Sequence, residues 1–87
     1  MFTVVLTKKA HKQYDKLSNK DRERAAIAID ELEHNPFAGK KLEGDHTGLW
    51  SVRVWPYRIL YSIQKEIITV TVVAIGHRQG IYKRAKR

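Results

Sequence analysis

Cysteine is absent from this chain of 87 residues, and acidic residues are scarce in its second half. Without cysteine, the chain can form neither disulfide bonds nor thiolate metal sites, which agrees with a reducing compartment. No apolar run approaches the roughly 18 residues of a membrane span. The N-terminal apolar run also lacks the preceding basic region and the cleavage site of a signal peptide. We therefore expect a soluble, cytoplasmic protein.

Internal repeats, low-complexity tracts and linkers are also missing from the sequence. A chain of this length has room for one hydrophobic core, so we expect a single domain spanning residues 1–87. Hydrophobic residues make up 43% of the chain and charged residues 30%, which is typical of a globular protein and not of a disordered one.

The positive charge is concentrated in the C-terminal half. Residues 1–48 contain nine Lys/Arg and eight Asp/Glu, a net charge of +1, whereas residues 49–87 contain eight Lys/Arg and only Glu66, a net charge of +7. Such a concentration of one sign favours an anionic partner. A basic solubility tail is the alternative for the cluster at the end of the chain, but it does not account for Arg53 and Arg58, which lie in strand-like sequence.

The N-terminal half predicts one strand followed by two helices. Residues 2–6 form a β-branched run typical of a strand. Thr7 can cap the helix that follows, and Ser18 begins a second helix with a capping-box pattern. The second helix must end near Asn35, because Pro36 disfavours helical geometry in the residue before it. Two short helices with a tight link predict an αα-hairpin.

The C-terminal half changes to an alternating pattern. Residues 36–48 are rich in Gly and Pro and are expected to form a loop. Strands are expected at about residues 49–55, 57–64 and 67–75, with a turn at Trp55-Pro56 and a two-residue connection at Lys65-Glu66. The basic segment after Gly76 is expected to be short and helical or irregular. The order β-α-α-β-β-β predicts an α+β fold with a small antiparallel four-stranded sheet and the helical hairpin on one face.

Strand alternation sorts the side chains into two faces. Trp50, Val52 and Val54 share one face, which we expect to pack against the helices. Arg53 and Arg58 then project from the uncovered face, which is predicted to be solvated and cationic.

Several motifs together resemble the RelE/ParE superfamily. The resemblance rests on GLWSVRV at residues 48–54, YRILY at 57–61, and VVAIGHR at 72–78 followed by Tyr82-Lys83, with PFAG at 36–39 and KL at 41–42 before them. With the helical hairpin in the expected place, the resemblance covers essentially the whole chain.

The resemblance implies a toxin of a type II toxin–antitoxin system. The RelE branch of this superfamily cleaves messenger RNA in the ribosomal A site without a metal, by attack of the RNA's own 2′-hydroxyl on the adjacent phosphate. The implied partners are a cognate antitoxin, the ribosome and mRNA, with no membrane and no small-molecule cofactor. The histidines show no spacing typical of a metal site, so we expect no metal and no other cofactor.

The same resemblance implies roles for individual residues. Arg58 and Arg78 match the phosphate-binding arginines, and arginine suits that task because it offers a planar fork of donors. Arg53 matches a basic position that binds phosphate or supports proton transfer. Tyr82 matches a tyrosine linked to base stacking or proton transfer. The alternatives are salt bridges to the acidic helical half for the arginines, and packing of the tail for Tyr82.

Two further positions bear on the chemistry. Ser51 departs from the family pattern, because many relatives carry a second basic residue there. His77 can take its place as an acid or base, since an unperturbed imidazole titrates near pH ~6.5; the alternative is a structural histidine at a strand end. Unbroken alternation would place His77 on the uncovered face and Arg78 on the covered one, unless Gly76 introduces a bulge.

Additional contacts to RNA are expected from Lys83 and Arg84 and from Trp55. Trp55 can stack on a base, or it can be a packing residue at the turn. Three functions remain open from the sequence. The first is a ribosome-dependent endoribonuclease, the second is a ParE-like inhibitor that binds DNA gyrase without catalysis, and the third is a nucleic-acid-binding module that has lost activity. The first is favoured by Arg53, Arg58, Arg78 and Tyr82, which a gyrase binder does not need.

Overall fold

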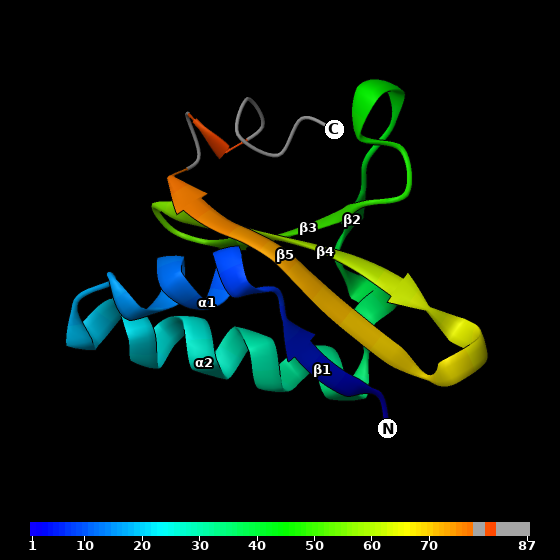
Figure 1. The fold of residues 1–87 in the computed structure, drawn as a ribbon, viewed down its shortest axis with the longest axis horizontal. Helices are drawn as coiled ribbons and strands as arrows, with labels where there is room; N and C mark the ends of the chain where they lie inside the picture. Colours follow the sequence, from blue (N-terminus) through cyan, green and yellow to red (C-terminus); the bar gives the residue numbers. More distant parts are fainter. Residues whose placement is uncertain (78–79, 82–87) are drawn as a thin grey trace.

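The computed structural model describes residues 1–77 and 80–81. Two helices lie on one side of a twisted sheet, and the segment 42–49 and residues 80–81 lie on the other side (Figure 1). The elements in chain order are β1 (Thr3–Leu6), α1 (Lys8–Asp15), α2 (Asn19–His34), η1 (Pro36–Ala38), β2 (Lys40–Lys41), η2 (Gly44–His46), β3 (Trp50–Val54), β4 (Tyr57–Gln64), η3 (Lys65–Ile67) and β5 (Thr69–His77). Within the described ranges, no helix has the length and apolar character needed to cross a bilayer.

The predicted α+β class and the helical hairpin on one face are confirmed, while the sheet differs in two details. It has five strands in the order β1-β5-β4-β3-β2. β1 runs parallel to β5, because the helical hairpin carries the chain back before the antiparallel meander begins. β2 lies inside the predicted loop and pairs only Lys40 and Lys41 with β3. Two paired residues are too few to leave an alternating pattern in a Gly-rich segment.

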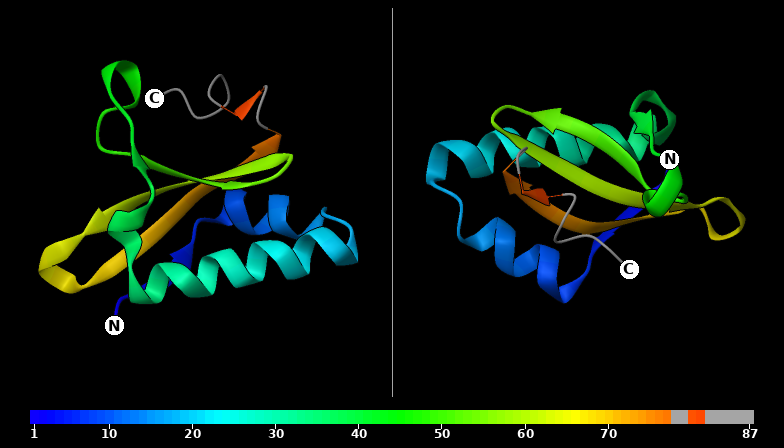
Figure 2. Two further views of the ribbon diagram at one scale, coloured as in Figure 1. Left: turned by 180° about the vertical axis from the view of Figure 1, so that it is seen from behind. Right: turned by 90° about the horizontal axis from the view of Figure 1, so that it is seen from above.

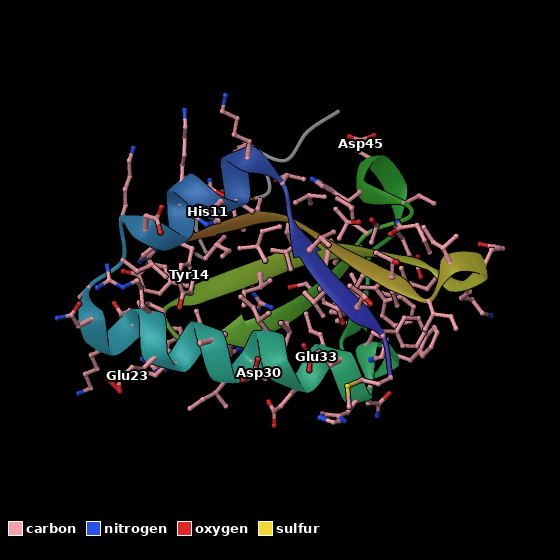
Figure 3. All side chains as sticks on the ribbon, turned by 60° about the horizontal axis from the view of Figure 1, so that its bottom comes forward. His11, Tyr14, Glu23, Asp30, Glu33 and Asp45 are labelled. Atoms are coloured by element: carbon pink, nitrogen blue, oxygen red, sulfur yellow. The ribbon has the colours of Figure 1, made fainter. Side chains whose placement is uncertain are left out.

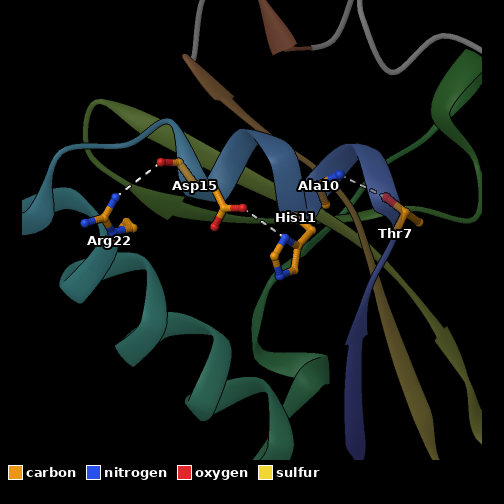
Figure 4. Close-up of polar contacts among 5 residues, drawn as sticks. All are labelled: Thr7, Ala10, His11, Asp15 and Arg22. Carbon is orange, nitrogen blue, oxygen red and sulfur yellow. Dashed lines mark hydrogen bonds and ion pairs between the residues drawn. The ribbon is translucent and has the colours of Figure 1, made fainter.

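Both predicted helix caps are present. The Thr7 hydroxyl accepts a hydrogen bond from the Ala10 backbone N–H at 3.1 Å (Figure 4), and Ser18 accepts from the Asp21 N–H at 3.2 Å. The turn between the helices is fixed by Arg22, whose guanidinium donates to the backbone carbonyls of Asp15 and Leu17 at 3.2 and 3.0 Å. The Asp15 carbonyl lies at the end of α1, where no intrahelical donor remains for it, and the Leu17 carbonyl lies in the link between the helices. One side chain of α2 therefore fixes both ends of this turn.

The sheet has a core on each face. The core under the helices contains Ala10, Ala25, Ala28, Leu32, Val54, Ile59, Tyr61, Val70, Val72 and Ile75. Trp50 and Val52 pack against it, as the alternation predicted. The second core is smaller and contains Leu42, Leu49, Leu60, Ala74 and Ile81. The face of the sheet away from the helices was predicted to be uncovered, but segment 42–49 and Ile81 cover part of it (Figure 2).

A β-bulge in β5 changes which side chains of the strand point toward the helices. Leu60 pairs with Ala74 but Tyr61 pairs with Val72, so Val73 has no partner in β4. The Thr7 hydroxyl donates to the Val73 carbonyl at 3.4 Å. Gln13 of α1 accepts from the Ile75 N–H at 2.8 Å. The alternation along β5 is thus broken at Val73, three residues before Gly76, where the sequence had suggested a bulge.

The loop after α2 is tied to the middle of the sheet. The buried Tyr61 hydroxyl donates to the Pro36 carbonyl at 2.7 Å. Gly39 crosses directly over the same hydroxyl: a Cβ at this position would collide with it and lie 2.9 Å from the Ser51 carbonyl. A glycine is required here because the backbone passes so close, and this contact brings β2 alongside β3.

The connection between β4 and β5 is longer than predicted. The chain forms the 3-10 turn η3 and then Ile68, which adopts a left-handed backbone conformation with φ 50°. Ile67 and Ile68 are 69% and 52% exposed. The two isoleucines were assigned to the strand because of their β-branching, yet they lie in the turn and β5 begins two residues later.

We expect Ile68→Asn to stabilise the fold. A β-branched residue in left-handed geometry costs about 1–2 kcal/mol, and asparagine tolerates that geometry. Since half of the Ile68 side chain is already exposed, little burial is lost. Urea denaturation should show a higher midpoint with an unchanged slope. Ile67→Asn is the matched control, because Ile67 is more exposed and has no positive φ; equal gains in both variants would contradict the explanation.

Candidate active site

Two arginines of adjacent strands form the centre of the candidate site. Arg53 of β3 and Arg58 of β4 are direct partners in the antiparallel register, so both side chains leave the same face of the sheet with Cβ atoms about 4.5–5.5 Å apart. Arg53 is exposed and Arg58 is half-buried. Like charges directly opposite each other destabilise a sheet, so this pair is more favourable when an anion lies between the guanidinium groups.

Neither guanidinium has a carboxylate partner in the part of the chain that the structure describes. The ion pairs there join His11 to Asp15 at 3.1 Å and Arg24 to Asp21 at 3.7 Å, and both lie on the helices. The alternative in which Arg53 and Arg58 form salt bridges with the helical half is therefore not observed within residues 1–77 and 80–81. Their charge is available to an external ligand.

Ser51 holds Arg58 in place. One terminal nitrogen of the Arg58 guanidinium donates to the Ser51 hydroxyl oxygen at 3.3 Å, and Ser51 is only 2% exposed. A buried hydroxyl on a strand is a rigid acceptor, and a neutral one adds no repulsion to the two positive charges. The serine at this position is thus a structural support for the half-buried arginine.

The floor of the site continues onto β5. Arg58 pairs on its other side with Gly76, and Ile81 covers that glycine: a Cβ at Gly76 would lie 3.2 Å from the Ile81 Cδ1. Since Ile81 is buried, it forms an apolar wall beside the arginine pair. The site therefore has two cationic side chains, Arg53 and Arg58, and a buried apolar residue, Ile81, at its margin on β5.

Trp55 lies next to the arginine pair at the β3–β4 turn. Its side chain is 53% exposed, and it lines a groove together with Arg53 and with residues Arg24, Ile27 and Glu31 of α2. Trp50 points to the helix side and packs edge-to-face on Phe37 with ring centroids 5.7 Å apart. Trp50 is therefore a packing residue on the helix side, as predicted, whereas Trp55 remains exposed at the turn.

His77 is not brought onto the face of the arginine pair. The register pairs it with Tyr57, and the two rings meet edge-to-face at 6.3 Å. The pair Arg58–Gly76 precedes it in the register, so His77 belongs to the opposite face, which is the consequence of the bulge at Val73. The unbroken alternation that would have placed His77 with the arginines does not exist in the strand.

Tyr57 is linked electrostatically to α2. Desolvation raises the pKa of the Tyr57 phenol, and a hydrogen bond to Asp21 together with its negative charge raises this pKa further. A phenol with a raised pKa keeps its proton at neutral pH, so Tyr57 is uncharged there. Tyr57 and His77 form a polar edge on the helix side of the strand ends.

Four of the sequence-predicted site residues, Arg78, Tyr82, Lys83 and Arg84, lie outside the described residues, and their roles remain predictions. The described residues contain no group of three His, Asp or Glu side chains arranged to hold a metal ion. The site that can be built from the structure therefore consists of Arg53, Arg58 and Ser51, with Gly76 and Ile81 beside them.

Sequence reasoning missed the supporting role of Ser51 and treated it only as a lost cation. The available signal was the register: when Arg53 pairs with Arg58, Ser51 lies on the same face of the sheet, two residues before Arg53 in β3. That register follows from the two-residue turn at Trp55-Pro56.

The chain is thus a small α+β domain with a helical hairpin on one face of its sheet and paired arginines on the other, and known toxins are similar to it. A family model described as "ParE toxin of type II toxin-antitoxin system, parDE" matches residues 4–82. Toxin RelG of Mycobacterium tuberculosis is 36% identical over 87 residues, covering 95% of this chain and 98% of that protein. The chain belongs to the RelE/ParE family of type II toxin–antitoxin toxins.

Solved structures agree with this assignment. A chain of the toxin–antitoxin complex RelBE2 from M. tuberculosis superposes with a TM-score of 0.83 and 30% identity, over 88% of this chain and 98% of that chain. The isolated E. coli RelE toxin gives a TM-score of 0.77 over 88% of this chain and 84% of its own, and at 23% identity it supports the fold alone.

We expect Asp21→Asn to lower the pKa of Tyr57. The substitution removes the negative charge that opposes formation of a phenolate, so deprotonation should begin at lower pH, closer to the usual value of about 10. The measurement is a spectrophotometric titration of tyrosinate, taken as the difference between each protein and its Tyr57→Phe counterpart. Identical difference curves with and without Asp21 would contradict the predicted coupling.

Proposed function

We propose that this toxin is a ribosome-dependent endoribonuclease that cleaves mRNA in the A site and thereby inhibits translation in the cytoplasm. The observation that supports it most is the cross-strand pair Arg53–Arg58, which has no carboxylate partner among the described residues. Two guanidinium groups on one exposed face suit a phosphodiester, because each can donate two parallel hydrogen bonds to its oxygens.

The proposed reaction needs no metal. The 2′-hydroxyl of the RNA attacks the adjacent phosphate, the phosphorus–O5′ bond breaks, and the negative charge on the phosphate oxygens increases on the way. Arg58, fixed by Ser51, binds this charge, and Arg53 either shares the phosphate or assists proton transfer. A preorganised donor of this kind is worth a factor of about 10²–10³ in rate.

The remaining roles come from the sequence alone. We assign a second phosphate contact to Arg78, base stacking or proton transfer to Tyr82, and backbone contacts to Lys83 and Arg84. Trp55 is proposed to stack on a base. His77 is the proposed acid or base, and its register places it on the other face from Arg58. Dependence on the ribosome agrees with this incomplete set of acids and bases, because the ribosome can position the RNA.

A cognate antitoxin is the proposed partner of the free toxin. The RelBE2 structure is that of a toxin–antitoxin complex, and so is the archaeal RelE–RelB structure from Pyrococcus horikoshii, which is 27% identical with a TM-score of 0.75. Acidic residues of such a partner can pair with the arginines that bind RNA. Neutralisation would then occupy Arg53 and Arg58 directly.

The alternative is a ParE-like inhibitor of DNA gyrase that acts without catalysis, and the description of the matching family model is the observation in its favour. The two proposals are separated by primer extension on a reporter message after induction of the toxin. Cuts within codons that appear only during translation support the nuclease. Intact messages with a gyrase-linked DNA-damage response support the inhibitor.

We expect Arg58→Ala to slow cleavage by about 10²–10³-fold, and Arg53→Ala with Arg58→Ala to abolish it, because the transition-state charge loses its donors. The assay is primer extension on a message translated in a purified system. Lys20→Ala is the matched control, since Lys20 is an exposed cation at the start of α2 and the variant should cut normally. A correctly folded double variant that cleaves like the wild type would refute the assignment.

We expect Ser51→Ala to reduce cleavage by up to about tenfold, since a hydrogen bond is worth about 0.5–1.5 kcal/mol. The loss should appear in the rate at saturating ribosomes, because the guanidinium is misplaced and not removed. In the Arg58→Ala background, the same substitution should have no further effect. Ser62→Ala is the control, because the Ser62 hydroxyl accepts a hydrogen bond from Gln64 and not from an arginine. Additive losses in the double variant would show that Ser51 does not act through Arg58.

A further inference from the structure

A groove with an aromatic wall opens beside the arginine pair. It lies between α2 and the end of β3, and its lining includes Arg24, Ile27, Glu31, Arg53 and Trp55. Trp55 comes from the β3–β4 turn and Ile27 from α2, and these two large apolar side chains are 53% and 61% exposed. Apolar side chains that gather at the surface mark a binding site more often than isolated ones do. We call this cleft the Trp55 groove.

The Trp55 groove is connected to the arginine pair through Arg53. β2 pairs only with Trp50 and Ser51, so within the described structure residues 52–54 of β3 have no strand on their outer side. Arg53 therefore belongs both to the cross-strand pair with Arg58 and to the lining of the groove. A nucleotide whose phosphate lies between the two guanidinium groups has its own base within reach of the groove.

The charges of the groove favour a neutral, flat group over an anion. Glu31 is exposed and takes part in neither of the two ion pairs among the described residues. Its carboxylate repels both the phosphates of an RNA backbone and the acidic side chains of a protein. The cation that α2 contributes, Arg24, is already paired with Asp21 at 3.7 Å. A base carries no net charge, and its face stacks on an aromatic side chain such as that of Trp55.

A strand added by a partner protein fits the groove less well. The open edge at residues 52–54 is only three residues long. In an antiparallel ladder the backbone groups of alternate residues point outward, so at most two of these residues can bond to a new strand. Such an edge holds a strand weakly, and an acidic side chain on that strand would meet Glu31.

Glu31 is placed to contact the edge of a base held between Trp55 and Ile27. It follows Ile27 by one turn of α2, about 6 Å along the axis at ~1.5 Å per residue. A carboxylate accepts hydrogen bonds and donates none. On the Watson–Crick edge of a single-stranded base, guanine presents two adjacent N–H donors. Adenine and cytosine present an amino group beside an acceptor, and uracil presents one N–H between two carbonyls, so the carboxylate fits guanine best.

We propose that the Trp55 groove binds one base of the message beside the scissile phosphate, with Trp55 as the stacking surface and Glu31 as the residue that selects guanine. This inference rests on the proposed function, because it assigns the base specificity of the same site. Contacts to phosphate carry no sequence information, so the arginine pair supports cleavage at any sequence. The choice of sequence then depends on Glu31.

The first measurement is an NMR titration of the isotope-labelled, full-length toxin with dinucleotides in the absence of ribosomes. Each dinucleotide has one phosphate, each of the four bases in turn on either side of it, and no attacking 2′-hydroxyl, so that it is not cut. The indole N–H signal of Trp55, identified by its loss in Trp55→Phe, reports stacking. The signal of Trp50 is the internal control, because Trp50 packs against the core. We expect guanine on one side of the phosphate to bind about 5-fold or more tighter than uracil.

Glu31→Gln should remove the preference for guanine and leave stacking on Trp55 intact, since an amide keeps the shape of the side chain but offers both a donor and an acceptor. Glu23→Gln is the matched control: Glu23 is also an exposed glutamate of α2 and does not line the groove (Figure 3). Both variants remove one negative charge. An equal loss of preference in the two variants would overturn the proposal, as would a wild type that binds all four bases equally or a Trp55 signal that saturating dinucleotide does not move.

The second measurement is cleavage of reporter messages during translation in a purified system, with the base beside the cut varied. The wild type should cut the message with guanine fastest, and Glu31→Gln should cut all four messages at similar rates. If Ile27→Ala and Glu31→Gln leave the base preference unchanged and weaken only the complex with the co-expressed antitoxin, the groove holds the partner protein and the proposal is wrong.

Failure of this inference is distinguishable from failure of the proposed function. A wild type that cuts messages during translation without regard to the neighbouring base leaves the nuclease proposal intact and refutes the role of Glu31. If the wild type cuts no message, the nuclease proposal fails, while the NMR titration still decides whether the Trp55 groove binds guanine.

Discussion

The unpaired Val73 in β5 is the constraint on which both faces of the sheet depend. Before it, the valines of β5 face the helices; after it, the alternation is reset, so that Ile75 returns to the helix side and Gly76 lies beside Arg58. Without the extra residue the register would set Ile75 against Arg58, and a bulky side chain would fill the space beside the guanidinium. Hydrogen bonds from Thr7 and to Gln13 hold the bulge, so the helical hairpin controls the geometry of the opposite face.

Local signals carried most of the fold prediction. The caps at Thr7 and Ser18 and the stop before Pro36 are short-range chemistry, and the structure has all three. The strands β3 and β4 follow from alternation with one buried face. The parallel pairing of β1 with β5 joins residues more than sixty positions apart, and no local pattern encodes such a partner. The prediction that Ile67 and Ile68 belong to a strand was wrong. It relied on their β-branched side chains, whereas in the structure both residues are exposed and lie in the turn before β5.

The candidate site was predictable to the extent that it depends on strand register. Arg53 and Arg58 were assigned to one face from parity alone, and the structure pairs them directly. The side of His77 was not predictable, since one additional residue in β5 reverses the parity and Val73 looks like any other β-branched strand residue. Ser51 was judged by the charge it lacks, whereas its contribution is a hydrogen-bond acceptor for Arg58 at 3.3 Å. A contact of that kind depends on rotamers that no spacing reveals.

The two edge strands of the sheet, β1 and β2, are short, which limits self-association through the sheet. Unpaired backbone N–H and C=O groups on an outer strand invite another copy to add its own strand, which is a route to aggregates. β1 offers only four residues and β2 only two, and both residues of β2 are lysines. A second molecule approaching β2 would bring the same cations into contact. Charge repulsion therefore disfavours pairing of two copies through β2. A strand added at this edge would have to come from a chain that carries negative charge.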